Sequence, residues 1–138
     1  MAIHHDASRI MGIIFFDGVC GLCNRFVDRL LRIDVEGRFL FAPLQGSTAR
    51  EQLPSGLADA LSSVVYLRNG QVLTRSDAAL RILIDLGGWH AMHRVWFIFP
   101  RVLRDAVYDW VARNRYRWFG KHDSCRLPMP EEREHFLP

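Results

Sequence analysis

A change of hydrophobic period at Asp17-Gly18 constrains the fold more than any other feature of the sequence. Residues 11–16 form a short, continuous apolar run with β-branched and aromatic side chains, which is typical of a buried strand. Over residues 20–34 the apolar residues recur at helical spacing opposite a polar face, which predicts an amphipathic helix. Residues 38–42 predict a second strand. A strand, a helix and a strand in this order indicate a right-handed parallel crossover.

The middle of the chain adds a hairpin to this unit. Residues 64–67 and 72–74 flank Asn69-Gly70, and Asn-Gly between two such runs is a strong signal for a tight β-hairpin. Residues 46–61 are only weakly helical, and a helix is predicted over residues 76–86, before a pair of glycines. We therefore expect an α/β fold in which a four-stranded mixed sheet is flanked by helices.

The C-terminal third is predicted to extend this core with further helices. Pro100 separates a segment rich in Trp and Phe from a longer helix with an apolar stripe, made of Leu103, Ala106, Val107, Trp110 and Val111. We expect residues 11–88 to form the core and residues 89–138 to pack on it as a helical extension and tail. The 138 residues then make a single domain.

The composition is that of a globular protein. Hydrophobic residues make up 49% of the chain and charged residues 24%, which argues against disorder. The longest apolar run, residues 95–99, is far shorter than the roughly 20 residues of a membrane span. The first residues lack the pattern of an export signal, and three cysteines are too few for a disulfide-stapled secreted scaffold. We therefore expect a reduced, cytoplasmic protein.

The two cysteines of Cys20-Gly21-Leu22-Cys23 lie where the first strand ends and the first helix begins. Backbone N–H groups without helical partners and the positive end of the helix dipole stabilise a thiolate at that position. This predicts that Cys20 is a partly exposed nucleophile and that Cys23, one turn inward, is the resolving thiol. Gly21 limits the bulk beside the nucleophile, and Leu22 is placed to contact a partner, as is Gly18 just before the pair.

Two other interpretations of the cysteines stay open. The first is purely structural, with both cysteines serving as small helix residues. The second is a zinc site, because Cys20 and Cys23 together with His122 and Cys125 make a set of three Cys and one His. About 100 residues separate the two halves of that set, and we favour the redox interpretation, which requires no metal.

Asp17 lies three residues before Cys20. Its carboxylate is a candidate proton acceptor for the cysteine pair and a candidate cap for the following helix. An aspartate after a hydrophobic first strand is also found in haloacid-dehalogenase-type phosphatases, but that motif needs a second Asp where this chain has Val19. The phosphatase interpretation is therefore rejected.

The pattern Asp17-x-x-Cys20-x-x-Cys23 resembles the signature of the DCC family of predicted thiol-disulfide oxidoreductases. The resemblance spans about residues 13–138 and is to the bacterial YuxK-type members in particular. It includes these stretches: residues 41–45, 63–65, the Gly70 hairpin, 76–78, 105–109, 112–116, 118–120 and Cys125. It implies a thioredoxin-like fold and a disulfide-exchange activity on protein or small-molecule substrates. No cofactor is then expected, and an external thiol or reductase would recycle the pair.

Two positions follow from comparison with better-known thioredoxin folds. Those folds usually carry a cis-proline before the third strand, where this chain has residues 60–63, so a serine or leucine backbone is expected in that place. Ser76 and Asp77, at a predicted strand end, are similar to the turn of glutathione transferases that binds the glutathione carboxylate. Ser76 is expected to be the N-cap of the next helix, and the pair is a candidate anion-binding site. Cys125 is a candidate third thiol.

Residues 89–121 combine six Arg and Lys121 with all four Trp of the chain. Such a basic, aromatic segment is found in proteins that bind nucleic acids or anionic membranes. We favour a helix whose aromatic side chains pack in the core while its arginines stay in solvent or pair with Asp105 and Asp109. No nucleic-acid partner is predicted. A non-enzymatic module that docks on a membrane or a protein through residues 89–121 remains the alternative.

Overall fold

The computed structural model describes residues 10–34, 37–54, 64–121, 130 and 135–138. The strands are β1 (Gly12–Phe16), β2 (Phe39–Pro43), β3 (Val65–Arg68) and β4 (Gln71–Thr74). The helices are α1 (Gly21–Ile33), α2 (Ser47–Gln52), α4 (Arg75–Leu86), the 3-10 segment η2 (Gly88–Ile98) and α5 (Arg101–Phe119). Among these residues, no helix is both long enough and apolar enough to cross a membrane.

The four strands form one mixed sheet in the order β2-β1-β3-β4. β1 runs parallel to β2, with Ile14 beside Phe41, and antiparallel to β3, with Ile14 beside Tyr66. β3 and β4 form the hairpin predicted from Asn69-Gly70, and both of these turn residues have a positive φ. The predicted α/β fold, a four-stranded mixed sheet of thioredoxin-like topology with a C-terminal helical extension, is confirmed.

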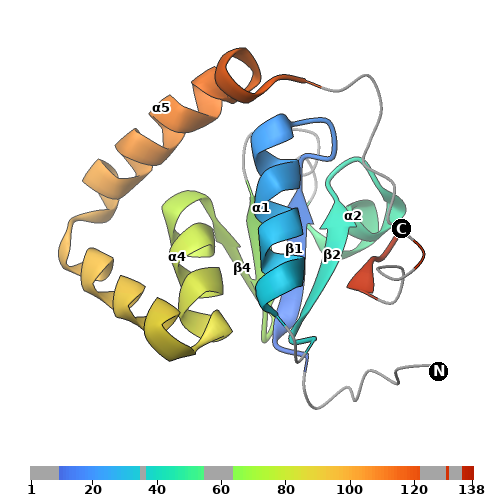
Figure 1. Cartoon of the computed structure of the whole chain (residues 1–138), viewed down its shortest axis with the longest axis horizontal. Coiled ribbons are helices and arrows are strands. Elements are labelled where there is room, and N and C mark those ends of the chain that lie inside the picture. Colours follow the sequence, from blue (N-terminus) through green and yellow to red (C-terminus); the bar gives the residue numbers. More distant parts are fainter. Residues whose placement is uncertain (1–9, 35–36, 55–63, 122–129, 131–134) are drawn as a thin grey trace.

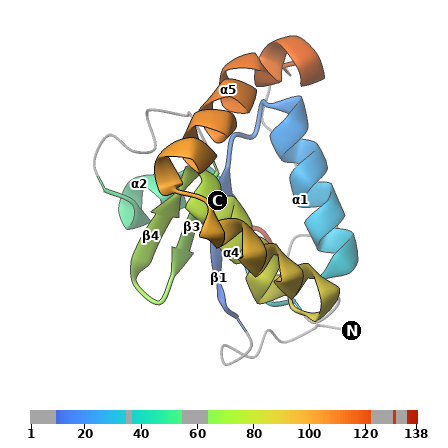
Figure 2. The ribbon, with the colours of Figure 1, turned by 90° about the vertical axis from the view of Figure 1, so that its left-hand side faces the viewer.

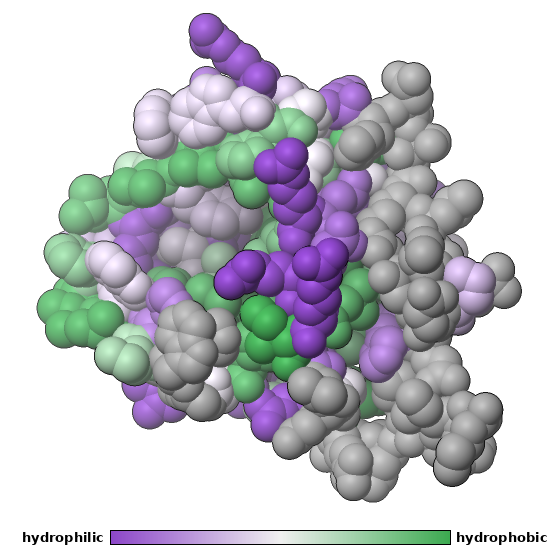
Figure 3. All heavy atoms as spheres, viewed as in Figure 1, coloured by the Kyte–Doolittle hydropathy of each residue, from purple (hydrophilic) through white to green (hydrophobic). Residues whose placement is uncertain are grey.

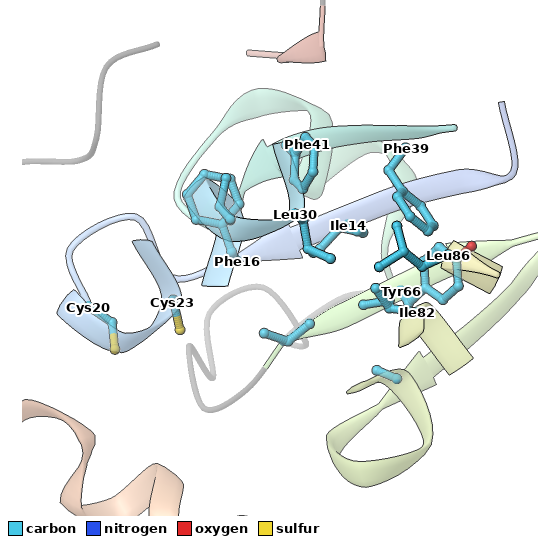
Figure 4. Packing of buried hydrophobic residues seen from close by; sticks show 13 residues of the cluster. Ile14, Phe16, Cys20, Cys23, Leu30, Phe39, Phe41, Tyr66, Ile82 and Leu86 are labelled. Carbon is cyan, nitrogen blue, oxygen red and sulfur yellow. The ribbon is translucent and has the colours of Figure 1, made fainter. Parts of the chain in front are cut away.

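Alternation along the strands places the core on both faces of the sheet. On one face Ile14 and Phe16 pack with residues of α1 and α4, among them Val27, Leu30 and Ile82 (Figure 4). On the other face Phe15 packs against a smaller cluster that includes residues of α2. Burial on both faces explains why β1 is an uninterrupted apolar run.

The last residues of the chain return to the sheet edge. Phe136 forms an isolated parallel bridge with Phe41, and the N–H of Leu137 donates to the carbonyl of Phe41 at 2.7 Å. The Phe136 ring packs edge-on against Phe16, with the ring centroids 6.1 Å apart. Residues 135–138 therefore contact β2 along the edge that does not pair with β1.

α5 does not bury the apolar stripe that the sequence predicts. It lies beside α4 and reaches the beginning of α1 with its C-terminal end (Figures 1 and 2). None of its residues is buried, and Leu103, Val107 and Trp110 are each more than half exposed. The prediction that this stripe packs in the core is wrong, because Leu103, Val107 and Val111 line an open cavity of about 540 Å³ between α4 and α5.

Candidate active site

The cysteine pair lies at the N-terminus of α1, as the sequence predicts. Cys20 is the N-cap residue and Cys23 lies in the first turn, and both thiols are free. Figure 4 shows the two sulfur atoms at the end of the larger core cluster, pointing the same way. Asp17 and Cys20 follow the C-terminal end of β1, whose position is fixed by its parallel pairing with β2.

The two thiols have opposite electrostatic properties. A hydrogen bond from the Cys23 thiol is the main cause that lowers the pKa of Cys20 to about 6, with backbone N–H groups and the charge of Arg115 acting in the same direction against burial. The same hydrogen bond, together with burial, raises the pKa of Cys23. The thiol of Cys20 therefore loses its proton more readily than the thiol of Cys23.

The prediction that Cys20 is partly exposed is wrong. Its exposed fraction is 0%, against 7% for Cys23. The end of α5 covers it: Cys20 forms an isolated bridge with Lys121, and the N–H of Gly21 donates to the carbonyl of Gly120 at 3.1 Å. A Cβ atom on residue 21 would lie 2.0 Å from the carbonyl oxygen of Phe119, so only glycine permits this approach. Gly21 therefore admits the C-terminal extension rather than a substrate.

Asp17 is 1% exposed and its carboxylate accepts four hydrogen bonds. One oxygen accepts from the N–H of Val19 at 3.2 Å and from Gln45 Nε2 at 2.7 Å. The other accepts from Arg115 Nη2 at 3.3 Å and from the hydroxyl of Tyr116. Through these hydrogen bonds, Asp17 connects the loop before Cys20 with the turn that follows β2 and with the C-terminal end of α5.

The loop between β1 and α1 is held by further buried contacts. The N–H of Gly18 donates to Gln45 Oε1 at 3.1 Å, and its carbonyl accepts from Asn24 Nδ2 at 3.1 Å. The backbone groups of Gly18 are thus used within the protein, whereas Leu22 is half-buried. Leu22, Cys23, Val64, Tyr108 and Arg115 line an apolar cavity of about 170 Å³, together with neighbouring residues of α1, α4 and α5.

α5 also covers the backbone position that precedes β3. The N–H of Val64 donates to the hydroxyl of Tyr108 at 3.0 Å. In better-known thioredoxin folds, the chain before the third strand presents its backbone to the substrate. Residues 60–63, for which that role was predicted, lie outside the described part of the chain.

Ser76 and Asp77 make their polar contacts with residues of α5. The N-cap of α4 is Thr74 rather than Ser76, so that prediction is wrong. The hydroxyl and the N–H of Ser76 both donate to Asp105, and Arg104 Nη1 lies 2.9 Å from Asp77 Oδ1. The turn at Ser76 therefore binds a carboxylate, that of Asp105 on α5. Ser76 and Asp77 together hold α5 against α4.

Sequence reasoning assigned no role to Gln45, Arg115 or Tyr116, which surround Asp17. All three lie in stretches that carry the family resemblance, and this was the only signal that pointed to them. His122 and Cys125 fall outside the described residues, so the zinc set and the third thiol stay predictions. Within the described ranges, no three His, Cys, Asp or Glu side chains are placed to hold a metal ion.

The sequence of the chain is similar to known proteins over most of its length. The family model for DCC1-like thiol-disulfide oxidoreductases matches residues 14–121. "Uncharacterized protein YuxK" of Bacillus subtilis is 41% identical over 128 residues, which are 91% of this chain and 93% of that protein. A chloroplastic DCC family protein of Arabidopsis thaliana is 40% identical over 119 residues, 83% of this chain and 69% of the other. No solved structure matches the chain.

Proposed function

Because the chain belongs to the DCC1-like thiol-disulfide oxidoreductase family, we propose that it exchanges disulfides through Cys20 as nucleophile and Cys23 as resolving thiol. The observation that carries this assignment is the opposite shift of the two pKa values within one hydrogen-bonded pair. A thiolate attacks while a thiol does not, so the shift distinguishes the two roles. The family model supports a redox role in general and leaves the substrate open.

The reaction proceeds in two displacements. The Cys20 thiolate attacks one sulfur of a substrate disulfide, forms a Cys20–substrate disulfide and releases the other sulfur as a thiolate, which takes a proton from solvent. Cys23 then loses its proton to solvent and attacks Cys20 Sγ, which releases the second substrate thiol. The substrate disulfide gains two electrons and becomes two thiols. The protein loses these two electrons and is left with a Cys20–Cys23 disulfide, which an external thiol or reductase reduces again. No resident cofactor is required.

We assign Asp17 a positioning role. Both oxygens of its carboxylate accept hydrogen bonds, four in all, and these hold the loop and α5 in place. We therefore do not assign Asp17 as the acceptor of the Cys23 proton. Arg115 connects the two parts of the site, because it pairs with Asp17 and its charge also lowers the pKa of Cys20.

Access to Cys20 requires a movement of residues 119–121. Attack on a disulfide needs the three sulfur atoms in contact, whereas Cys20 has no exposed surface and forms a bridge with Lys121 of this segment. We infer that the segment opens for each exchange and that reaction rates depend on this opening. The cytoplasm, where thiols are kept reduced, is the compartment that suits this chemistry.

Trapping the mixed disulfide tests the assignment. Cys23→Ala protein treated with oxidised glutathione is expected to carry one glutathione, located on Cys20 by peptide mass spectrometry, because no resolving thiol remains. Cys20→Ser protein under the same conditions is the control and is expected to carry none at position 23. A glutathione on Cys23 instead of Cys20 would contradict the assignment of the two roles.

A further inference from the structure

Hydrogen bonds and ion pairs attach α5 to the rest of the protein. Arg104 contacts Ser76 and Asp77 of α4, and Asp105 accepts from Ser76. Further along the helix, Arg115 and Tyr116 both contact Asp17. Between these polar contacts, apolar residues of α5 and η2 face α4 across a cavity of about 540 Å³, whose α4 lining includes Ala79 and Leu80.

Large apolar side chains from η2 to α5 are exposed nevertheless, and four of them, Trp96, Phe99, Leu103 and Val107, line that cavity. Every large hydrophobic side chain that is exposed within the described ranges lies between residues 92 and 118: Met92, Val95, Trp96, Ile98, Phe99, Val102, Leu103, Val107, Trp110 and Trp118. We call this set the apolar rim. Figure 3 shows hydrophobic residues gathered at the left edge, where η2 meets α5. Ile98 and Val102, 79% and 83% exposed, lie on either side of that corner.

The apolar rim is also positively charged. Arg113 and Arg117 follow Trp110 by three and seven residues, which places them on the same face of α5, and both are exposed. Arg94, on η2, is exposed as well. The two acidic residues of the segment are already engaged, because Asp105 and Asp109 face Arg75 of α4. The surface therefore combines apolar and indole side chains with arginines that form no ion pair with any residue the structure describes.

We propose that the apolar rim docks on the surface of an anionic lipid bilayer. Tryptophan, aliphatic and arginine side chains on one helical face are the composition of a helix that lies in the membrane interface, with its apolar side chains below the lipid head groups. The arginines then meet lipid phosphates. A second copy of this chain fits less well, because a symmetric contact would bring the same cations together.

Vesicle binding tests the proposal. The full-length protein is expected to co-sediment with vesicles of phosphatidylglycerol and phosphatidylcholine, with a blue shift of its tryptophan emission, and to bind phosphatidylcholine vesicles much more weakly. Ile98→Ser/Val102→Ser is expected to lower the partition coefficient by about tenfold or more, because two exposed aliphatic side chains no longer enter the bilayer. Both sites are highly exposed, so the folded core is not altered.

Two double variants, each of which removes two arginine charges, give a second, independent measurement. Arg113→Gln/Arg117→Gln is expected to lower binding to the anionic vesicles by about tenfold, and Arg29→Gln/Arg50→Gln, which removes two exposed charges from α1 and α2, is expected to change it far less. Wild-type protein that stays in solution with both vesicle types overturns the proposal. So does a serine variant that binds as wild type does. A dimer that depends on Ile98 and Val102, without vesicle binding, assigns the apolar rim to a second copy instead.

Discussion

Replacing Cys20 with serine is expected to lower the rate at which the reduced protein cleaves oxidised glutathione by on the order of 10³-fold or more. The reason is chemical: a serine hydroxyl carries no anion near neutral pH, whereas the pKa of Cys20 is lowered to about 6. The measurement is a single-turnover reaction of pre-reduced protein with oxidised glutathione, followed by the release of glutathione thiol.

Cys23→Ala is the matched control for that experiment, because it keeps the nucleophile and lacks the resolving thiol. It is expected to release one glutathione thiol for each protein molecule, where the wild type releases two. Cys125→Ser, measured beside them, shows whether the predicted third thiol takes part. Cys20→Ser protein that reacts at the wild-type rate would show that the assigned nucleophile is wrong.

Asp17→Asn is expected to destabilise the protein by about 3–5 kcal/mol, because it removes the charge that compensates a buried guanidinium. Asp17 and Arg115 have side-chain exposures of 1% and 12%, so solvent cannot take over the missing partner. The free energy of unfolding from a urea titration measures this loss. The same variant is expected to speed the alkylation of Cys20 by iodoacetamide, since Tyr116 and Arg115 anchor the end of α5 that covers it.

Asp109→Asn is the matched control on the same helix. Its ion pair with Arg75 is 3.6 Å long and lies between side chains that are 40% and 51% exposed, so its loss is expected to cost less than about 1 kcal/mol. Alkylation of Cys20 should then stay at the wild-type rate. Asp17→Asn protein that is as stable as the Asp109→Asn protein would contradict the structural role of Asp17.

The parts of this fold that short-range patterns specify were predictable. The apolar run before Asp17, the amphipathic pattern after Cys20 and the Asn69-Gly70 turn each depend on neighbours within a few residues, and the sheet follows from their order. The pair of cysteines at a strand-to-helix junction is local in the same sense. Its placement at the N-terminus of α1 therefore agrees with the prediction.

The parts that depend on distant contacts were not predictable from local patterns. Arg115 and Tyr116 are 98 and 99 residues away from Asp17, and no periodicity marks that pairing. The burial of Cys20 was missed for the same reason, because Phe119 approaches through the space that Gly21 leaves. The apolar stripe of α5 was assigned to the core because a hydrophobic pattern identifies an apolar face without identifying what covers that face.

The ultraviolet absorbance of the thiolate, followed as a function of pH in the reduced protein, tests the central claim most directly. A thiolate forms as pH rises, so a lowered pKa means that Cys20 is already charged at neutral pH. The account predicts a titration midpoint at about pH 6 that is absent in Cys20→Ser protein and moves upward in Cys23→Ala protein, which lacks the hydrogen-bond donor. A Cys20 midpoint at the ordinary value of about 8.5 would contradict it.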